Sequence, residues 1–378
     1  MKRNVQMDIL RFLAIFLVIG AHLQPAPLTG GVLGMLGAQW RIHGGFGVPL
    51  FFTLSGFLIG GLLLSELRKH EHISISRFLI RRGFKIYPAY FVFLAYLFLL
   101  PLSKALFAGQ DLRHAFATLL GDYYPNFLFL QNYIGPNPAG HTWSLAVEEH
   151  FYIMLPFAIA TLVAAHRTRW LTPVCLLSPV LFTAIRISSA CLGDPYLCNL
   201  SITMGATHLC LDGLLVGVGL RSVYEFYPEA FGRLRSWRIP FLLAGPLILI
   251  AVQGRSLYGI PVERILPVSM LAATALFLGV YHTSARDFGS GSQFLRRLAK
   301  PFAHIGADSY SIYLWHVTIL GIAGKILLRF HWPTNTSLAW FSSAGLISCT
   351  IFAIGILLAR LVEWPTIRLR DRLFPSRS

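Results

Sequence analysis

Charged residues are scarce in this sequence, and acidic residues are the scarcest. Only 13% of the 378 residues are charged and 55% are hydrophobic, whereas a soluble domain has about 25% charged residues. This composition excludes an ordinary soluble protein and predicts a polytopic membrane protein in a lipid bilayer. The 16 acidic residues are outnumbered by 32 basic ones. That excess would suit a nucleic-acid partner, but the basic residues lie mainly in alternate short loops, so we expect no nucleic acid.

The sequence also has few cysteines and no metal-binding motif. Its five cysteines show no CxxC or metal-ligand spacing, so we expect no metal site and no bound cofactor. Cys191 and Cys198 lie in a predicted loop on the oxidising side of the membrane, where a disulfide and two free thiols are both compatible with the spacing. A cleavable signal peptide is not expected, because the first apolar stretch contains Arg11 and lacks a small-residue cleavage site.

Hydropathy predicts an all-α bundle of about ten transmembrane helices, in a single domain over residues 1–378. The spans are expected at 7–23, 45–65, 86–107, 144–165, 170–190, 208–223, 239–253, 264–283, 304–325 and 337–361. Loops on one side hold 22 of the 32 basic residues, which places both termini in the cytoplasm. Residues 108–143 contain Pro125, Pro136 and Pro138. They are too irregular for a span but apolar enough to enter the membrane from outside.

The first predicted span carries two ionisable groups, Arg11 and His22. Such groups inside a bilayer mark function or a buried partner. Eleven residues at about 100° each bring the two side chains to within about 20° of one helix face, roughly 16 Å apart along the axis. A polar stripe therefore runs from the cytoplasmic third of the span to near its outer end.

Carboxylates and imidazoles gather at the outer end of the fourth span, in HTWSLAVEEHFY. His141, Glu148, Glu149 and His150 offer proton-transfer partners there. Alternatively these groups cap the helix, because acidic residues favour a helix N-terminus and Ser144 suits the N-cap position. The motif alone is compatible with both interpretations.

Basic residues precede the third span, in RFLIRRGFKIYPAYF. Arg77 is interpreted as an ordinary positive-inside anchor. Arg81, Arg82 and Lys85 lie at the cytoplasmic start of a helix, where they are suited to bind phosphates.

The second and ninth spans contain further candidate groups. Ser55 lies beside Gly56 and Gly60, and the G-x-S-x-G elbow of hydrolases is absent. Close helix packing through the two glycines is therefore favoured, although Ser55 can still bind a substrate. In the ninth span Tyr313 and His316 share a helix face. Together with the ionisable groups of the first and fourth spans, they predict a shared polar cavity.

Five motifs occur in an order typical of one family: the Arg11–His22 pair, VPLFFTLSGFLIG, RRGFKIYPAY, HTWSLAVEEHFY and SYSIYLWH. With them, nearly the whole chain resembles acyltransferase family 3, membrane-bound bacterial O-acyltransferases that modify surface sugars and antibiotics. The resemblance implies transfer of an acyl group, usually acetyl, from cytoplasmic acyl-CoA to a hydroxyl of a sugar or glycoconjugate at the bacterial inner membrane. It implies that Arg11 and His22 are the family's essential pair. It also implies functional roles for Arg82 and Lys85 in the second basic motif, and for the residues of the acidic motif: Trp143, Ser144, Glu148 and Glu149.

The sequence departs from the family pattern at two motifs. In THLCLDGLLVG, Cys210 stands where an Arg is frequent, so Asp212 is expected to lack its usual partner. In LVEWPTIRL, Trp364 replaces a common Arg. Some family members carry an additional extracytoplasmic hydrolase-like domain, and we expect any such partner of this chain to be a separate protein or absent.

The residues are compatible with acyl transfer. His22 is the candidate base, because the pKa of an imidazole lies near neutrality, and it either deprotonates the acceptor or accepts the acyl group itself. Glu149 would orient the imidazole or favour its protonated form. Arg11 would bind the donor or stabilise the oxyanion. The alternatives are a transporter of a small polar or anionic solute, which predicts inverted repeats that we do not find, and a sensor or scaffold.

Overall fold

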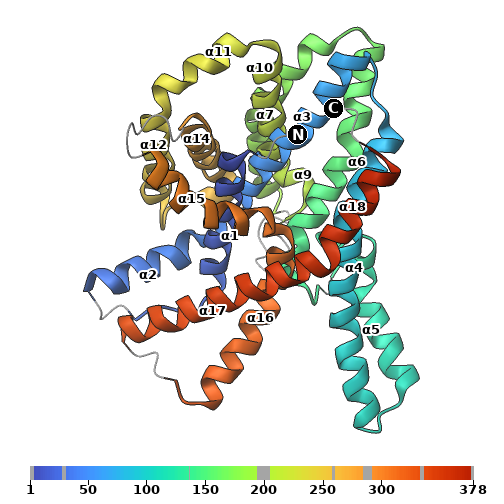
Figure 1. Ribbon diagram of the computed structural model, residues 1–378, viewed down its shortest axis with the longest axis vertical. Helices are drawn as coiled ribbons and strands as arrows, with labels where there is room; N and C mark the ends of the chain where they lie inside the picture. Colours follow the sequence, from blue (N-terminus) through green and yellow to red (C-terminus); the bar gives the residue numbers. More distant parts are fainter. Residues whose placement is uncertain are drawn as a thin grey trace. The chain divides into compact units, whose positions relative to one another are not determined.

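The computed structural model describes several stretches of the chain, and they are almost entirely helical (Figure 1). Their residues are 4–27, 31–135, 137–193, 205–257, 260–283, 292–332 and 336–375. Within these stretches two short strands, β1 (Ser256–Leu257) and β2 (Ile260–Pro261), pair antiparallel. The predicted all-α class is confirmed.

Contacts between helices divide the chain into two compact units, each assembled from segments far apart in the sequence. Unit 1 comprises Met1–Leu58, Val223–Gln253 and Val268–Leu361. Unit 2 comprises Ile59–Ser222, Gly254–Pro267 and Val362–Ser378. The expectation of a single domain over residues 1–378 stays a prediction.

Unit 1 is built around the N-terminal helix α1 (Val5–His22), which packs against α15, η1, α2 and α16. The apolar side chains of α1 supply the buried face, with Leu10, Ile15 and Ile19 fully buried. The other helices of this unit are α2 (Gly31–His43), η1 (Gly44–Phe46), the first half of α3 (Gly47–His70), α11 (Pro228–Arg233), η4 (Leu234–Trp237), α12 (Arg238–Val252), α14 (Val268–His282), α15 (Ser292–Ala307), α16 (Ser309–Arg329), α17 (Ser337–Leu358) and most of the π-helix η6 (Ala359–Glu363).

Glycines allow the neighbours of α1 to reach its backbone. A Cβ atom on Gly306 of α15 would lie 1.8 Å from the carbonyl oxygen of Asp8. A Cβ atom on Gly44 of η1 would lie 2.2 Å from the nitrogen of Ala21. Since no larger residue fits at either place, both elements contact α1 directly, as small residues allow in membrane bundles. These contacts hold both ends of the helix that carries Arg11 and His22.

Unit 2 contains the long helix α4 (Ile75–Phe107), which packs against α5, α6 and α18. The predicted close packing at Gly60 is observed inside this unit, where a Cβ atom would lie 3.3 Å from Cα of Val218 on α10. The other elements are the second half of α3, α5 (Leu112–Phe127), η2 (Gly140–Thr142), α6 (Trp143–Ala164), η3 (Thr168–Trp170), α7 (Leu171–Cys191), α9 (Thr207–Cys210), most of α10 (Asp212–Phe226), β1, β2, α13 (Val262–Ile265) and α18 (Trp364–Leu373).

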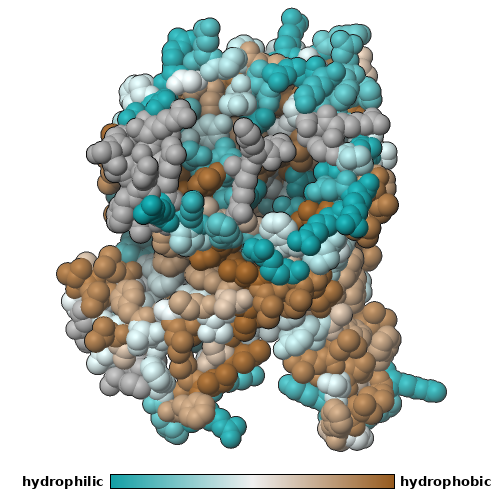
Figure 2. All heavy atoms as spheres, viewed as in Figure 1, coloured by the Kyte–Doolittle hydropathy of each residue, from teal (hydrophilic) through white to brown (hydrophobic). Residues whose placement is uncertain are grey.

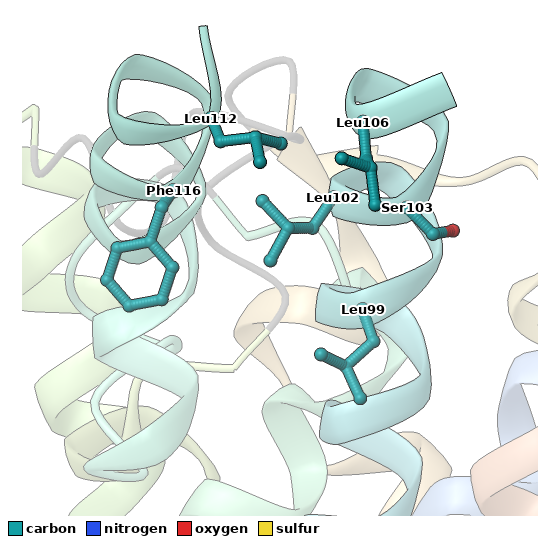
Figure 3. Close-up of a pocket in the computed structure, with 6 residues that line it drawn as sticks. All are labelled: Leu99, Leu102, Ser103, Leu106, Leu112 and Phe116. Carbon is teal, nitrogen blue, oxygen red and sulfur yellow. The ribbon is translucent and has the colours of Figure 1, made fainter. Parts of the chain in front are cut away.

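The segment 108–143 is more regular than the prolines predicted. Asp111 caps α5 by accepting a hydrogen bond from the backbone nitrogen of Arg113 at 2.9 Å, and Pro125 lies in the last turn of the helix. A cavity of about 400 Å³ lies between α4 and α5 (Figure 3). Its lining is apolar apart from one hydroxyl: Leu99, Leu102, Ser103, Leu106, Leu112 and Phe116.

Eight helical stretches among the described residues are long and apolar enough to cross a membrane. The other two predicted spans, 208–223 and 264–283, correspond mainly to α10 and α14, which have 15 residues each. A helix of that length reaches about 22 Å, less than the roughly 30 Å of a bilayer core. The stretch Gly31–His70 begins before the predicted span 45–65, because α2, η1 and α3 follow one another without a break.

Hydrophobic side chains cover much of the face drawn in Figure 2, as suits contact with lipid. On α12 the residues Ile239, Leu243, Leu247 and Ile250 are all about 60% exposed and lie on one helix face. A soluble protein rarely exposes such a continuous apolar stripe. This face of α12 is therefore suited to contact the acyl chains of a bilayer.

Candidate functional site

Arg11 is held by an acidic partner within its own helix. Its Nη1 donates to Asp8 Oδ1 at 2.5 Å, one turn earlier in α1. The Asp8 side chain is buried, whereas the Arg11 side chain is 25% exposed. The carboxylate therefore orients the guanidinium and leaves other N–H groups of its five donors for a ligand. The sequence analysis did not predict this partner, although the i, i+3 spacing of Asp8 and Arg11 was a signal for it.

His22 meets a second imidazole inside unit 1. It is the last residue of α1 and is exposed, whereas His316 of α16 is fully buried. The centroids of the two rings are 5.0 Å apart, with their planes at 61°. The edge-on arrangement brings together the two histidines that the first and ninth spans supply.

The surroundings of His316 fix its tautomer. Its Nδ1 lies 2.5 Å from the carbonyl oxygen of Tyr313. A carbonyl only accepts, so Nδ1 carries the hydrogen, and Nε2 of the neutral ring is the acceptor. The rings of Tyr313 and His316 are 5.3 Å apart, which confirms that they share a face. The ring of Tyr313 also contacts Phe51 of α3, and Ser55 lies half-buried one turn further along that helix.

Glu149 of α6 has a hydroxyl partner in unit 2. The phenol of Tyr87, on α4, donates to Glu149 Oε1 at 2.5 Å. Glu149 is buried, whereas Tyr87 is 36% exposed. A buried carboxylate with a phenol partner can hold or pass a proton. The sequence analysis did not predict Tyr87 as a site residue, although its position two residues after Lys85 was a signal for that role.

Arg82 and Glu148 share an aromatic neighbour, Tyr152 of α6. The guanidinium carbon of Arg82 lies 5.3 Å from the centroid of this ring, a cation–π contact. The Tyr152 hydroxyl donates to Glu148 Oε2 at 3.0 Å. The ring thus supports the planar cation that the sequence predicts to bind phosphates, and Lys85 lies half-buried one turn further along α4.

Arg81 faces a different partner, the C-terminal segment of the chain. Its Nη2 donates to Asp371 Oδ1 of α18 at 3.1 Å, and its Nη1 donates to the Phe374 carbonyl. Arg77 donates to the carbonyl of Pro375. These contacts clamp the end of α18 to the start of α4, a role that the sequence did not reveal for either arginine.

The acidic motif begins differently from the predicted cap. Thr142, not Ser144, is the N-cap residue, so α6 starts at Trp143 and Ser144 lies inside the first turn. The helix begins early because η2 leads into it without a break. Trp143 packs against Gly205, where a Cβ atom would overlap the indole at 2.0 Å.

Asp212 lacks the family's usual partner at position 210, as expected, but it has an ionic partner from another helix. Arg186 of α7 donates from Nη2 to Asp212 Oδ2 at 2.8 Å. The same guanidinium donates to the carbonyl oxygens of Leu209 and Ile265 at 2.8 and 2.9 Å. Both charged side chains are buried. The positive charge therefore comes from another helix and not from position 210, where this chain has Cys210.

The candidate residues fall into two groups, each established within its own unit. Unit 1 holds the imidazole pair and the Arg11 ion pair, and unit 2 holds the acidic and basic motifs. The predicted cavity shared by His22 and Glu149 stays a prediction. Among the described residues no three His, Cys, Asp or Glu side chains are placed to hold a metal ion. Cys198 lies outside the described residues, so its pairing with Cys191 also stays a prediction.

Comparisons with known proteins identify relatives over most of the chain. The chain is 26% identical to the peptidoglycan O-acetyltransferase OatA of Listeria monocytogenes over 340 residues, which are 85% of this chain and 50% of that protein. It is 27% identical to the O-acetyltransferase OatA of Staphylococcus aureus over 322 residues, 79% of this chain and 49% of that protein. The chain thus spans about half the length of these curated relatives.

No solved structure matches the chain. A family model described as an acyltransferase domain matches residues 4–375, nearly the whole length. The chain therefore belongs to acyltransferase family 3.

Proposed function

We propose that the protein is a membrane O-acetyltransferase. It moves an acetyl group from acetyl-CoA, supplied in the cytoplasm, to a hydroxyl of a sugar or glycoconjugate at or across the bacterial inner membrane. Two relatives named as O-acetyltransferases support the reaction, and the name of one of them supports a peptidoglycan-type acceptor. The observation that carries the proposal is the His22–His316 pair at the end of α1, on the helix that also holds the Arg11–Asp8 ion pair.

His22 is the base of the proposed reaction. It takes the proton of the acceptor hydroxyl, the oxygen attacks the thioester carbonyl, a C–O bond forms and the C–S bond breaks. The proton on the imidazole then passes to the departing thiolate, so that free CoA leaves as a thiol. His316 contacts the His22 ring in its fixed tautomer and so limits the orientations of that ring.

Arg11 supplies positive charge to this unit. Because Asp8 holds its guanidinium at Nη1, the side chain is preorganised, and its remaining N–H groups can stabilise the oxyanion or bind the donor. In unit 2, Arg82 and Lys85 are the groups proposed to bind the phosphates of CoA. The contacts of Arg81 with the C-terminal segment favour Arg82 over Arg81 for that task.

The decisive experiment measures CoA release and acetyl transfer by the purified protein in lipid nanodiscs, with labelled acetyl-CoA and soluble peptidoglycan fragments. We expect His22→Ala to lower transfer by about two to four orders of magnitude, the usual contribution of a positioned base. His114→Ala is the matched control, because His114 is exposed on α5. A folded His22→Ala protein that transfers acetyl at an undiminished rate would move the chemistry to another residue.

A further inference from the structure

Unit 2 contains a second cluster of imidazoles and hydroxyls that the proposed chemistry does not use. Thr207, the first residue of α9, lies at its centre. Its Oγ1 is 2.7 Å from Nδ1 of His150 on α6. The side-chain nitrogen Nδ2 of Asn132 donates to the same oxygen at 2.9 Å and to the carbonyl oxygen of Gly205 at 2.8 Å. Three segments far apart in the sequence therefore meet through one hydroxyl.

A second hydroxyl–imidazole pair lies beside the first. The phenol oxygen of Tyr133 is 3.0 Å from Nδ1 of His208, and it accepts a hydrogen bond from the backbone nitrogen of His208 at 3.2 Å. The two rings are stacked, with centroids 5.7 Å apart and planes at 19°. The ring of Tyr133 is also 6.3 Å from that of His150. The five side chains, Asn132, Tyr133, His150, Thr207 and His208, are called the hydroxyl cluster below.

The hydroxyl cluster has a buried base and an accessible rim. Asn132 and Thr207 are buried, Tyr133 and His150 are half-buried, and His208 is exposed. Among the described residues, Oδ1 of Asn132 has no hydrogen-bond donor although it is shielded from solvent. A buried acceptor without a donor is costly, which favours a ligand or solvent group that offers O–H or N–H to it.

The chemistry of these side chains selects the class of ligand. Hydroxyl, imidazole and amide groups all donate and accept hydrogen bonds, and none of the five is a carboxylate, an ammonium or a guanidinium. An anion would find no fixed positive charge among them, and an apolar molecule would leave the polar groups unmatched. A sugar ring satisfies both the polar groups and the stacked aromatic plane, since it carries several hydroxyls on an otherwise apolar ring.

We propose that the hydroxyl cluster is the binding site for the acceptor sugar. This inference rests on the proposed O-acetyltransferase function and adds to it the place where the acceptor is recognised. The positive-inside pattern predicts that residues 108–143 and 191–207 face the outside, which is the side where an acceptor of the cell envelope arrives. Tyr133 and His208 form the rim that the sugar meets first, and Asn132 accepts from one of its hydroxyls.

Two variants separate acceptor binding from donor chemistry. Tyr133→Phe keeps the aromatic ring and removes the hydroxyl, and His208→Gln keeps a polar side chain and removes the stacked ring. We expect each variant to raise the KM for soluble peptidoglycan fragments about tenfold, the value of roughly one hydrogen bond. Hydrolysis of acetyl-CoA without acceptor should stay within about twofold of the unmodified protein, because the proposal assigns these two residues to the sugar and not to the donor. Matched controls are Tyr227→Phe and His114→Gln, since both residues are exposed and lie outside the cluster.

A binding measurement makes the test independent of turnover. Diethyl pyrocarbonate modifies accessible imidazoles, so saturating peptidoglycan fragments should slow modification of His208 severalfold and leave that of His114 unchanged. Equal modification of His208 with and without fragments, or an unchanged KM in both variants, would overturn the sugar site while acetyl-CoA is still consumed. Failure of the proposed function is a different result, in which the unmodified protein consumes no acetyl-CoA. Consumption of acetyl-CoA therefore distinguishes the two failures.

Discussion

Arg186 offers the sharpest test of how unit 2 is held together. Its guanidinium makes three hydrogen bonds, to Asp212 of α10, to the carbonyl of Leu209 and to the carbonyl of Ile265. The Arg186→Met change keeps most of the side-chain volume and removes all three donors. The Asp212 carboxylate would then stay buried without its charged partner.

The magnitude follows from that burial. Removing one partner of a buried ion pair costs about 3–5 kcal/mol, because an uncompensated charge remains. The two carbonyl oxygens add to the cost where they find no other donor. We therefore expect Arg186→Met to lower the free energy of unfolding by about 3–5 kcal/mol. Replacing both charged residues, as in Arg186→Met with Asp212→Leu, should recover most of the loss, because an apolar pair of similar volume is often neutral or stabilising.

Equilibrium unfolding in mixed detergent micelles measures these differences. Arg255→Met is the matched control, because Arg255 is exposed, and it should change stability by less than about 0.5 kcal/mol. An Arg186→Met protein within about 1 kcal/mol of the unmodified one, or a double variant no more stable than the single one, would refute the buried pair as a source of stability.

Three further changes test the structure and the proposed function. Gly306→Ala should displace α15 from α1, which should lower the free energy of unfolding by about 1–3 kcal/mol and also lower the rate of acetyl transfer. Gly321→Ala should change neither quantity, because a methyl group there would meet no atom within 4 Å. Arg82→Ala should raise the KM for acetyl-CoA more than it lowers turnover, because phosphate contacts persist in the transition state. Arg81→Ala should leave that KM nearly unchanged, and the reverse pattern would exchange their roles. Reporters fused to the C-terminus and into residues 191–207 should report opposite sides of the membrane, and a common side would contradict the predicted topology.

Apolar patterning was sufficient to predict eight of the ten expected spans, because a bilayer leaves few alternatives to a long helix. It could not define where unbroken helical stretches begin, as at α2, whose residues 31–43 include three glycines and little charge. Nor could hydropathy distinguish a full span from the 15 residues of α14. Apolar composition says that a segment is buried in lipid or protein, but it does not say which.

Partners on one helix leave a signal in their spacing, even though the Arg11–Asp8 pair was missed, whereas the partners of Glu149 and Asp212 lie on other helices and leave none. Tyr313 and His316 could be paired from their spacing alone. The donor to Glu149 comes from α4, 62 residues earlier, and the guanidinium beside Asp212 comes from α7, 26 residues earlier. No periodicity in the sequence connects such positions, because helix packing decides which faces meet.

Position 210 has no arginine, yet Asp212 still has a positive partner. A sequence motif is therefore a weaker guide to a buried ion pair than the need of the carboxylate for a positive charge. A buried carboxylate needs a positive partner and hydrogen-bond donors, but the chain position from which they come is unrestricted. Here Arg186 delivers the guanidinium to Asp212 from a neighbouring helix and also holds the carbonyl of Leu209, two residues beyond Thr207. The same side chain thus anchors α9, which presents Thr207 and His208 to the hydroxyl cluster. Loss of Arg186 should therefore weaken acceptor binding as well as the fold.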